Sequence, residues 1–285
     1  MLILVGFVIV FGSILGGYVM HHGKIAVLIQ VSEFIIIGGA GIGAVVIANR
    51  PAVLKAMVRE LFGLLKPAPY GKEAYTELLH VLYDVFYEAR RDGLVGIEAH
   101  VENPHESEIF KKYPRFLANH HAVDLLSDTM KVLLTGAVDD HHLAEILDLD
   151  LEQHHKEAMA VPNALQTVAD AMPAFGIVAA VLGVIITMGK IGGAPEQVGK
   201  SVAAALVGTF LGILLAYGVF QPLALAVQSR VHDEEAYMSV IRTALLSFAR
   251  GDPPITSVEF ARRNIEPGDR PSFAEPEEST RKLAA

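Results

Sequence analysis

Cysteine and tryptophan are absent from this 285-residue chain, and basic residues are fewer than acidic ones. Without cysteine the protein has no disulfide, no thiolate metal ligand and no cysteine nucleophile. The 23 Lys and Arg against 32 Asp and Glu give a net charge of −9, and no basic patch stands out, so we expect no nucleic-acid partner. No Ser/His/Asp or paired-carboxylate arrangement stands out either, and we expect neither enzymatic activity nor a cofactor.

Long hydrophobic runs are present instead. Hydrophobic residues make up 52% of the chain, and they gather in four stretches at residues 1–20, 33–49, 172–189 and 201–223. A helix needs about 20 mostly apolar residues to cross a bilayer. The sequence therefore predicts four transmembrane helices. The first has no basic segment before it, which favours a retained helix over a signal peptide.

The basic residues predict how these spans are oriented. Lys24, Lys190 and Lys200 are the few cations in the two short turns, and nearly all others lie in the long segment after Arg50 or after Pro222. Because cytoplasmic loops carry the excess of Lys and Arg, both of these segments are assigned to the cytoplasm. We therefore expect a multi-pass membrane protein with both termini cytoplasmic.

The expected fold is an all-α integral membrane protein with four transmembrane helices, a large cytoplasmic helical domain between the second and third, and a cytoplasmic C-terminal helix and tail. Amphipathic spacing predicts helices within 76–92, 122–135 and 139–159, the first two ending at Gly93 and Gly136. From Gly251 the chain is rich in proline and charge, which predicts a flexible tail. The predicted domains are 1–50, 51–171, 172–224 and 225–285.

The interiors of the four predicted spans contain no Asp, Glu, Lys, Arg or His. Proton carriers normally place an ionisable relay inside the membrane. If this chain conducts ions, the carboxylate must come from another subunit, and Thr187, Thr209 and Tyr217 are the weakly polar groups left to line the path. The alternative for each threonine is a hydrogen bond to its own helix backbone.

Glycine and proline residues in the predicted spans indicate how these helices pack and where they bend. Glycines four residues apart, at Gly12 and Gly16 and at Gly208 and Gly212, together with the run 38–43, predict closely approaching helices, although membrane helices are generally rich in glycine. Pro173 is expected at a helix start, whereas Pro222 lies where the helix continues and should kink it. A kink beside a pore is a plausible hinge, and an ordinary structural role at the ends of helices explains the two prolines about as well.

Eight of the twelve histidines occur as neighbours, in pairs at 21–22, 120–121, 141–142 and 154–155. Adjacent helical residues point about 100° apart, so such a pair does not make a metal site as residues at i and i+4 would. Solvated surface is the predicted environment, with no metal bound.

The third and fourth spans contain the segments PAFGIV (173–178) and VGTFLGILLAYG (207–218), which resemble the MotA/TolQ/ExbB proton-channel family. The similarity to its flagellar stator A subunits extends through FG (11–12), GY (17–18) and GAGIG (39–43) in the first two spans. It continues through ENP (102–104), ESEIF (106–110) and YP (113–114), and covers nearly the whole chain to about residue 273.

This resemblance implies a complex in the bacterial inner membrane, made of five A subunits around two MotB-like B subunits, whose single helices carry the proton-accepting aspartate. It implies that Pro173 and Pro222 couple ion flow to conformational change and that Thr209 and Tyr217 lie near that carboxylate. Sodium-driven relatives carry threonine where this chain has Ala180, which favours protons as the coupling ion. Arg90 and Glu98 match the charged pair that contacts the rotor protein FliG, although the neighbouring Arg91 leaves open which arginine dominates.

Two other functions remain possible at this stage. One is an ExbB/TolQ-like energiser of envelope transport, but those relatives have one span before the large cytoplasmic segment and this sequence predicts two. The other is a membrane scaffold that conducts no ions, which the missing intramembrane acid favours.

Overall fold

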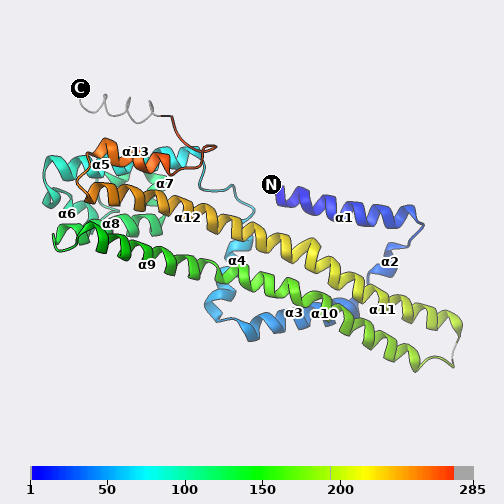
Figure 1. The fold of residues 1–285 in the computed structure, drawn as a ribbon. Helices are drawn as coiled ribbons and strands as arrows, with labels where there is room; N and C mark the ends of the chain where they lie inside the picture. Colours follow the sequence, from blue (N-terminus) through cyan, green and yellow to red (C-terminus); the bar gives the residue numbers. More distant parts are fainter. Residues whose placement is uncertain (1, 193, 273–285) are drawn as a thin grey trace. The chain divides into compact units, whose positions relative to one another are not determined.

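The computed structural model describes residues 2–192 and 194–272, and over these residues the protein contains helices and no strand (Figure 1). One short 3-10 helix, η1, and one turn of π-helix, η2, interrupt the α-helices. In chain order the elements are α1 Leu2–Met20, α2 Ile25–Leu28, α3 Val31–Ala48, α4 Pro51–Gly63, α5 Lys72–Arg91, α6 Leu94–Glu102, η1 Phe110–Lys112, α7 Pro114–Leu117, α8 His120–Leu134, α9 Asp140–Ala158, α10 Ala160–Met188, α11 Pro195–Leu215, η2 Ala216–Phe220, α12 Gln221–Ala249 and α13 Pro254–Arg263.

The chain divides into two compact units, one formed by 1–67 with 158–230 and the other by 68–157 with 231–285. Four helical stretches in the described residues are long and apolar enough to cross a membrane, within Leu2–Met20, Ile25–Ala48, Asp140–Met188 and Pro195–Ala249. This confirms the prediction of an all-helical chain with four candidate spans.

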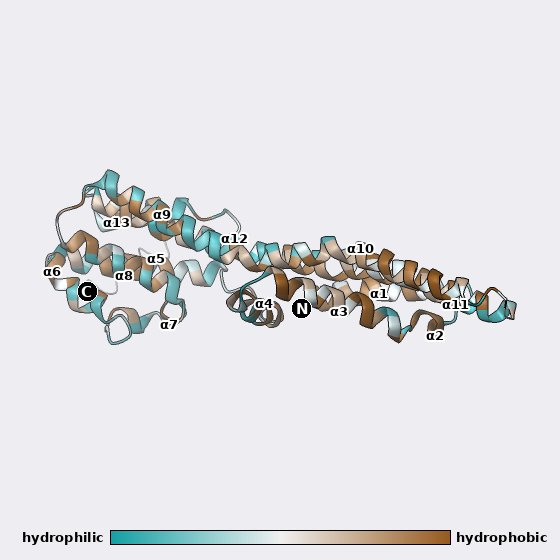
Figure 2. Ribbon diagram, turned by 90° about the horizontal axis from the view of Figure 1, so that it is seen from below, coloured by the Kyte–Doolittle hydropathy of each residue, from teal (hydrophilic) through white to brown (hydrophobic). Residues whose placement is uncertain are grey.

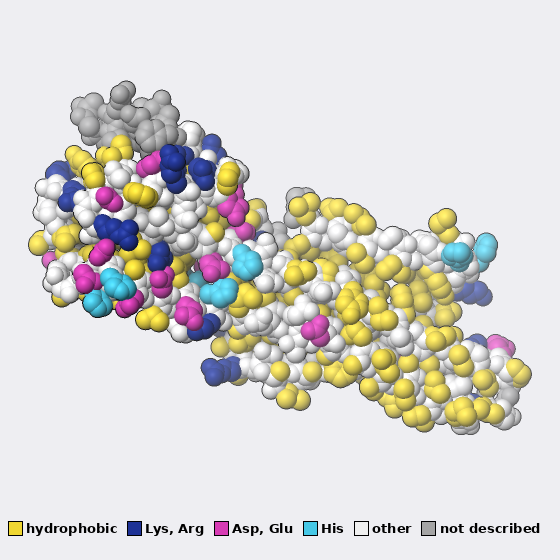
Figure 3. All heavy atoms as spheres, viewed as in Figure 1, with side chains coloured by type: hydrophobic (Ala, Val, Ile, Leu, Met, Phe, Trp, Pro, Cys, Tyr) yellow, Lys and Arg dark blue, Asp and Glu magenta, His cyan; other side chains and the backbone are white. Residues whose placement is uncertain are grey.

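The first unit contains α1, α3, α10 and α11, and its helices are rich in hydrophobic residues (Figure 2). Its core lies between α3, α10 and α11 and includes Ile37, Met172 and Leu211. Outside this core, large apolar side chains are exposed, among them Val8, which is 72% exposed, and Ile185, which is 61% exposed. Hydrophobic atoms cover much of the visible face of these helices (Figure 3). Apolar side chains on the outside suit a lipid environment.

The second unit has the organisation of a soluble helical domain. Amphipathic α5 buries one face against α6, α7 and α13, and the ring of Phe86 stacks on that of Phe248 with 4.4 Å between centroids. Charged side chains are grouped over this unit in Figure 3. The helices predicted before Gly93 and Gly136 are confirmed, and both glycines adopt positive φ, at 76° and 65°, which L-residues rarely adopt.

The C-terminal segment differs from the predicted flexible tail as far as residue 272. Pro254 begins α13, which packs on α5 and buries Val258 and Ala261, with Ile265 buried just beyond the helix end. The composition of this segment suggested few apolar residues that could be buried. The apolar residues that it has lie three and four positions apart, so they form one face of a helix, and this face packs against α5. Residues 273–285, the rest of the predicted tail, lie outside the described residues.

Candidate functional site

Helices α10 and α11 pack with their backbones in contact, because glycines face each other across the interface. A Cβ atom added at Gly212 would lie 2.7 Å from the Met172 carbonyl oxygen and 2.8 Å from the Gly176 Cα. One added at Gly176 would lie 2.9 Å from the Gly208 carbonyl oxygen. The close approach predicted at Gly208 and Gly212 is confirmed, and it brings the two family-like segments together.

Glu33 is the buried acid at this interface, and the sequence analysis missed it. It lies in the first turn of α3 and is only 4% exposed. Ser32 Oγ donates a 3.3 Å hydrogen bond to Glu33 Oε1, whereas Oε2 has no hydrogen-bond partner among the described residues. A Cβ atom at Gly208 would lie 2.8 Å from this Oε2 and 3.3 Å from the backbone nitrogen of Ala180. Gly208 thus leaves the space that the carboxylate occupies, next to Ala180.

The prediction that the spans contain no ionisable group therefore needs correction. The hydropathy window placed Glu33 at the edge of the second span, where a charge would reach water. Helix α3 instead begins at Val31, and the apolar stretch extends from Ile25 to Ala48, so that Glu33 lies within the stretch. Its side chain is enclosed by protein. The signal in the sequence was a lone acid directly before the run of apolar residues 34–37.

The candidate hydroxyl groups fall into two kinds. Thr187 Oγ1 donates a 2.8 Å hydrogen bond to the Gly183 carbonyl oxygen, which is the local backbone bond considered as its alternative role. Thr209 is half-buried beside Gly208, and its hydroxyl makes no hydrogen bond within the described residues. Tyr217 is 61% exposed on the π-helical turn. Thr209 and Tyr217 thus keep polar groups available to another molecule.

The structure contradicts the prediction for Pro173 but not the one for Pro222. Pro173 is inside α10, which begins at Ala160, so the expectation of a helix start is wrong. Residues 160–172 form the part of this helix that precedes Pro173. Pro222 follows the π-helical turn η2, so the regular series of α-helical backbone hydrogen bonds is interrupted where the sequence predicted a kink. A proline cannot donate the usual backbone bond, and a wider turn before it accommodates that loss.

Arg90 and Arg91 at the end of α5 have different partners. Arg91 forms ion pairs with Glu88 and Asp92, and its hydrogen bond holds the pKa of the Asp92 carboxyl below its usual value. Arg90 donates to the Asp252 carbonyl oxygen at 3.2 Å and lies over the Phe248 ring, leaving its guanidinium exposed. Exposed Glu98 has no ion pair or hydrogen bond within the part of the chain that is described.

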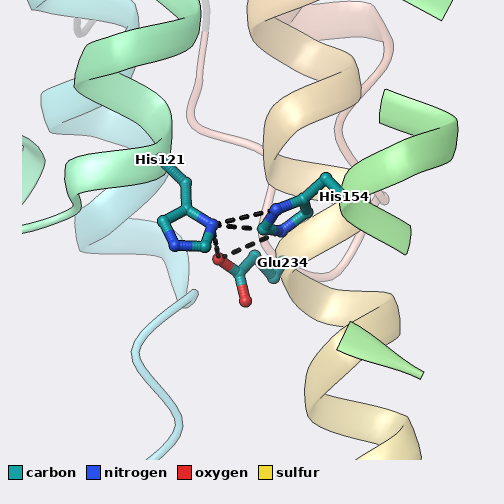
Figure 4. Close-up of side chains that lie close together, drawn as sticks. All are labelled: His121, His154 and Glu234. Atoms are coloured by element: carbon teal, nitrogen blue, oxygen red, sulfur yellow. Dashed lines mark hydrogen bonds and ion pairs between the residues drawn. The ribbon is translucent and has the colours of Figure 1, made fainter. Parts of the chain in front are cut away.

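Members of two different histidine pairs meet in the second unit. His121 from α8 and His154 from α9 approach Glu234 from α12 (Figure 4). The predicted solvated surface holds for exposed His141 and His142 but not for His154, whose side chain is 21% exposed. Spacing along the chain relates only histidines that are close in sequence, whereas helix packing brings together His121 and His154, which are more than 30 positions apart.

Comparison with known proteins places the chain in a family. Motility protein A of Salmonella typhimurium and that of Escherichia coli K12 are each 39% identical over 281 residues, covering 99% of this chain and 95% of theirs. The chain belongs to the motility protein A family. The MotA N-terminal family matches residues 4–93, and the MotA/TolQ/ExbB proton channel family matches residues 117–240. The chemotaxis protein LafT of Vibrio parahaemolyticus is 34% identical over 91% of both chains.

Solved structures share the MotA fold. The chain aligns with a structure of C. jejuni MotAB with a TM-score of 0.76 and 21% identity, covering 95% of this chain and 98% of the other. The flagellar MotAB stator complex of Bacillus subtilis gives a TM-score of 0.68 at the same identity. At this identity the likeness establishes the fold, while family membership rests on the more similar sequences.

Proposed function

We propose that the chain is the A subunit of a flagellar motor stator, which conducts protons across the bacterial inner membrane and converts their flow into torque. The observation that carries this proposal is the 39% identity to motility protein A over almost the entire chain. The glycine-mediated contact of α10 with α11 supports it, because that contact lies inside the matched proton-channel segment.

The proposed assembly contains five copies of this chain around two MotB-like subunits. MotAB complexes are known for two relatives of the same fold, which supports a B-type partner here. The partner's transmembrane helix would supply the proton-accepting aspartate, facing Thr209 and Tyr217. The exposed apolar side chains of α1, such as Val8, and its open glycines Gly12 and Gly16 suit contacts with lipid or neighbouring chains.

In the proposed mechanism a proton from the periplasm neutralises the partner's aspartate, and this changes which A-subunit surface its helix prefers. The ring of A subunits then steps around the B dimer, with Pro173 and Pro222 next to the moving segments. A proton crossing about 100 mV supplies roughly 2.3 kcal/mol for each step. The second unit, on the cytoplasmic side together with both termini, transmits the step to the rotor protein FliG.

Glu33 is proposed as a further ionisable group of the ion path. It is the buried acid within the first unit's apolar helices, and its Oε2 borders Gly208 and Ala180. An intramembrane acid is costly to bury and is usually tied to function. Its place beside Ala180 puts a titratable oxygen next to the position that distinguishes the sodium-driven relatives.

Ion selectivity is tested by expressing the chain with a B partner in cells that lack their own stator. We expect swimming and cytoplasmic acidification to persist when sodium is removed, because Ala180 offers no side-chain oxygen as a sodium ligand. Ala180→Thr should leave the complex assembled and weaken proton-driven swimming. Swimming that stops without sodium would overturn the proton assignment, and the absence of flux under all conditions would favour a scaffold.

Rotor contact is tested by charge reversal on the second unit. Arg90→Glu and Glu98→Lys should each reduce swimming speed while leaving proton flux unchanged, since both side chains are exposed and distant in sequence from the spans. Arg91→Ala serves as the matched control, because Arg91 is engaged by Glu88 and Asp92. A larger loss for Arg91→Ala than for Arg90→Glu would reassign the contact to Arg91.

The ExbB/TolQ-like alternative is not favoured. The described chain has two apolar helices, α1 and α3, before the large segment that begins after residue 67, rather than one. Its near full-length relatives are motility proteins.

A further inference from the structure

Three potential metal ligands from three helices converge in the second unit. The nitrogens of His121 and His154 and a carboxylate oxygen of Glu234 lie within 4.8 Å of one another. Figure 4 shows both imidazole rings and the carboxylate turned toward a common point. The rings stand edge to face, at 84°, with 4.4 Å between centroids.

The distances between these atoms match the edges of a metal coordination polyhedron. His121 Nδ1 lies 2.9 Å from His154 Nδ1 and 3.4 Å from His154 Nε2. Glu234 Oε1 lies 3.6 Å from His121 Nδ1 and 3.5 Å from His154 Nε2. Tetrahedral zinc with bonds of about 2.0–2.1 Å places its ligand atoms about 3.3 Å apart. A nearly equilateral triangle of this size is what three ligands of one ion require.

A second layer of hydrogen bonds holds the ligands in place. Tyr70 lies beside the Glu234 carboxylate, and burial together with that negative charge raises the pKa of Tyr70. Asn119 donates to the Tyr70 hydroxyl at 3.1 Å, and its own side-chain oxygen caps α8 by accepting from the Ala122 nitrogen. Because His121 lies in the first turn of α8, the same asparagine fixes both the carboxylate and the start of the helix that carries a histidine. Such outer partners are typical of metal sites.

The neighbourhood is accessible and negatively charged. A cavity of about 360 Å³ is lined by His121 and His154 together with Asp124, Asp128 and Asp150. The carboxylates attract a cation, and the open side leaves a fourth coordination position for water. The His121 side chain is 57% exposed, so an ion can enter without unfolding the unit.

We propose that His121, His154 and Glu234 bind a divalent transition-metal ion of the zinc class, and that the ion joins α8, α9 and α12. Two imidazoles and one carboxylate favour such ions over Mg²⁺ and Ca²⁺, which prefer oxygen ligands. The chain has no cysteine and therefore no disulfide that could cross-link these three helices, so the bound ion would hold the second unit together at this point.

The test uses the full-length chain purified in detergent and stripped with a chelator, with Zn²⁺ as the probe in competition with a chromophoric chelator. We expect one high-affinity Zn²⁺ per chain, and a rise in the unfolding temperature when Zn²⁺ is added. His154→Gln should abolish both effects, and Tyr70→Phe should weaken binding about tenfold through the outer layer. His141→Gln is the matched control, since His141 is an exposed histidine of the same helix.

A second readout guards against misfolded variants. Co²⁺ bound to the unmodified chain should give the intense visible absorption of a tetrahedral site, and His121→Gln should remove it while the metal-free unfolding temperature stays within a few degrees. Zinc binding that is absent in the unmodified chain, unchanged in His154→Gln, or lost equally in His141→Gln would overturn the proposal.

Discussion

Replacing Gly212 by alanine should separate α10 from α11 and abolish swimming. The added methyl group would meet the Met172 carbonyl oxygen at 2.7 Å and the Gly176 Cα at 2.8 Å, and these are backbone atoms that cannot rotate away. Overpacking of this kind destabilises a protein by about 1–3 kcal/mol. Thermal unfolding of the purified complex and swimming of cells without their own stator measure the effect.

Gly199→Ala is the matched control for this substitution. Gly199 lies in the same helix, but apart from its chain neighbours and the backbone of its own helical turns, no atom of the described residues comes within 4 Å of a Cβ atom there. Alanine in an exposed helical position normally stabilises the helix, by about 0.8–1 kcal/mol relative to glycine. A Gly212→Ala protein as stable and motile as Gly199→Ala would contradict the close backbone contact.

Glu33→Gln should reduce proton flux to the level of cells without the chain, while the complex still assembles. Glutamine has nearly the shape of glutamate and keeps the space left by Gly208 filled, but it cannot take up or release a proton. The buried Oε2 has no partner among the described residues, so the charge is not needed for a structural ion pair. Cytoplasmic acidification measures the flux, and co-purification with the B subunit measures assembly.

Two further variants separate a role in ion flow from a role in folding. Glu33→Asp retains a titratable group and should keep part of the flux, whereas Ser32→Ala removes only the 3.3 Å bond to Oε1 and should keep nearly all of it. If the carboxylate has no part in conduction, Glu33→Gln will stabilise the protein by removing a buried charge and leave flux intact. That result would restore the view that this chain supplies no ionisable group.

Much of the fold was predictable because local patterns carry it. Runs of about 20 apolar residues can be satisfied only by helices in a bilayer, and so the four spans followed from hydropathy. The amphipathic spacing of α5 and α8, and the glycines that end them, fixed helices whose bounds differ little from those predicted. The contact at Gly208 and Gly212 also followed from spacing, since small residues four apart lie on one helix face.

The errors occurred where a residue's role depends on an element distant in the sequence. Pro173 was expected at a helix start, yet α10 continues through it from Ala160 and packs against α3 and α11. The segment after Gly251 was expected to be flexible, but α5 provides a surface for α13. In both cases composition described the segment correctly and could not supply the packing partner.

The sequence by itself determined that the protein is helical, that four stretches can cross a membrane, and which segments carry the family resemblance. All of these depend on residues near one another in the chain, where helical periodicity and hydrophobicity act directly. Only the tertiary structure decided that Glu33 is buried against Gly208 and that His121, His154 and Glu234 lie together. Their neighbours come from other helices, and a side chain's burial, charge environment and ligand geometry are set by which helices pack against it.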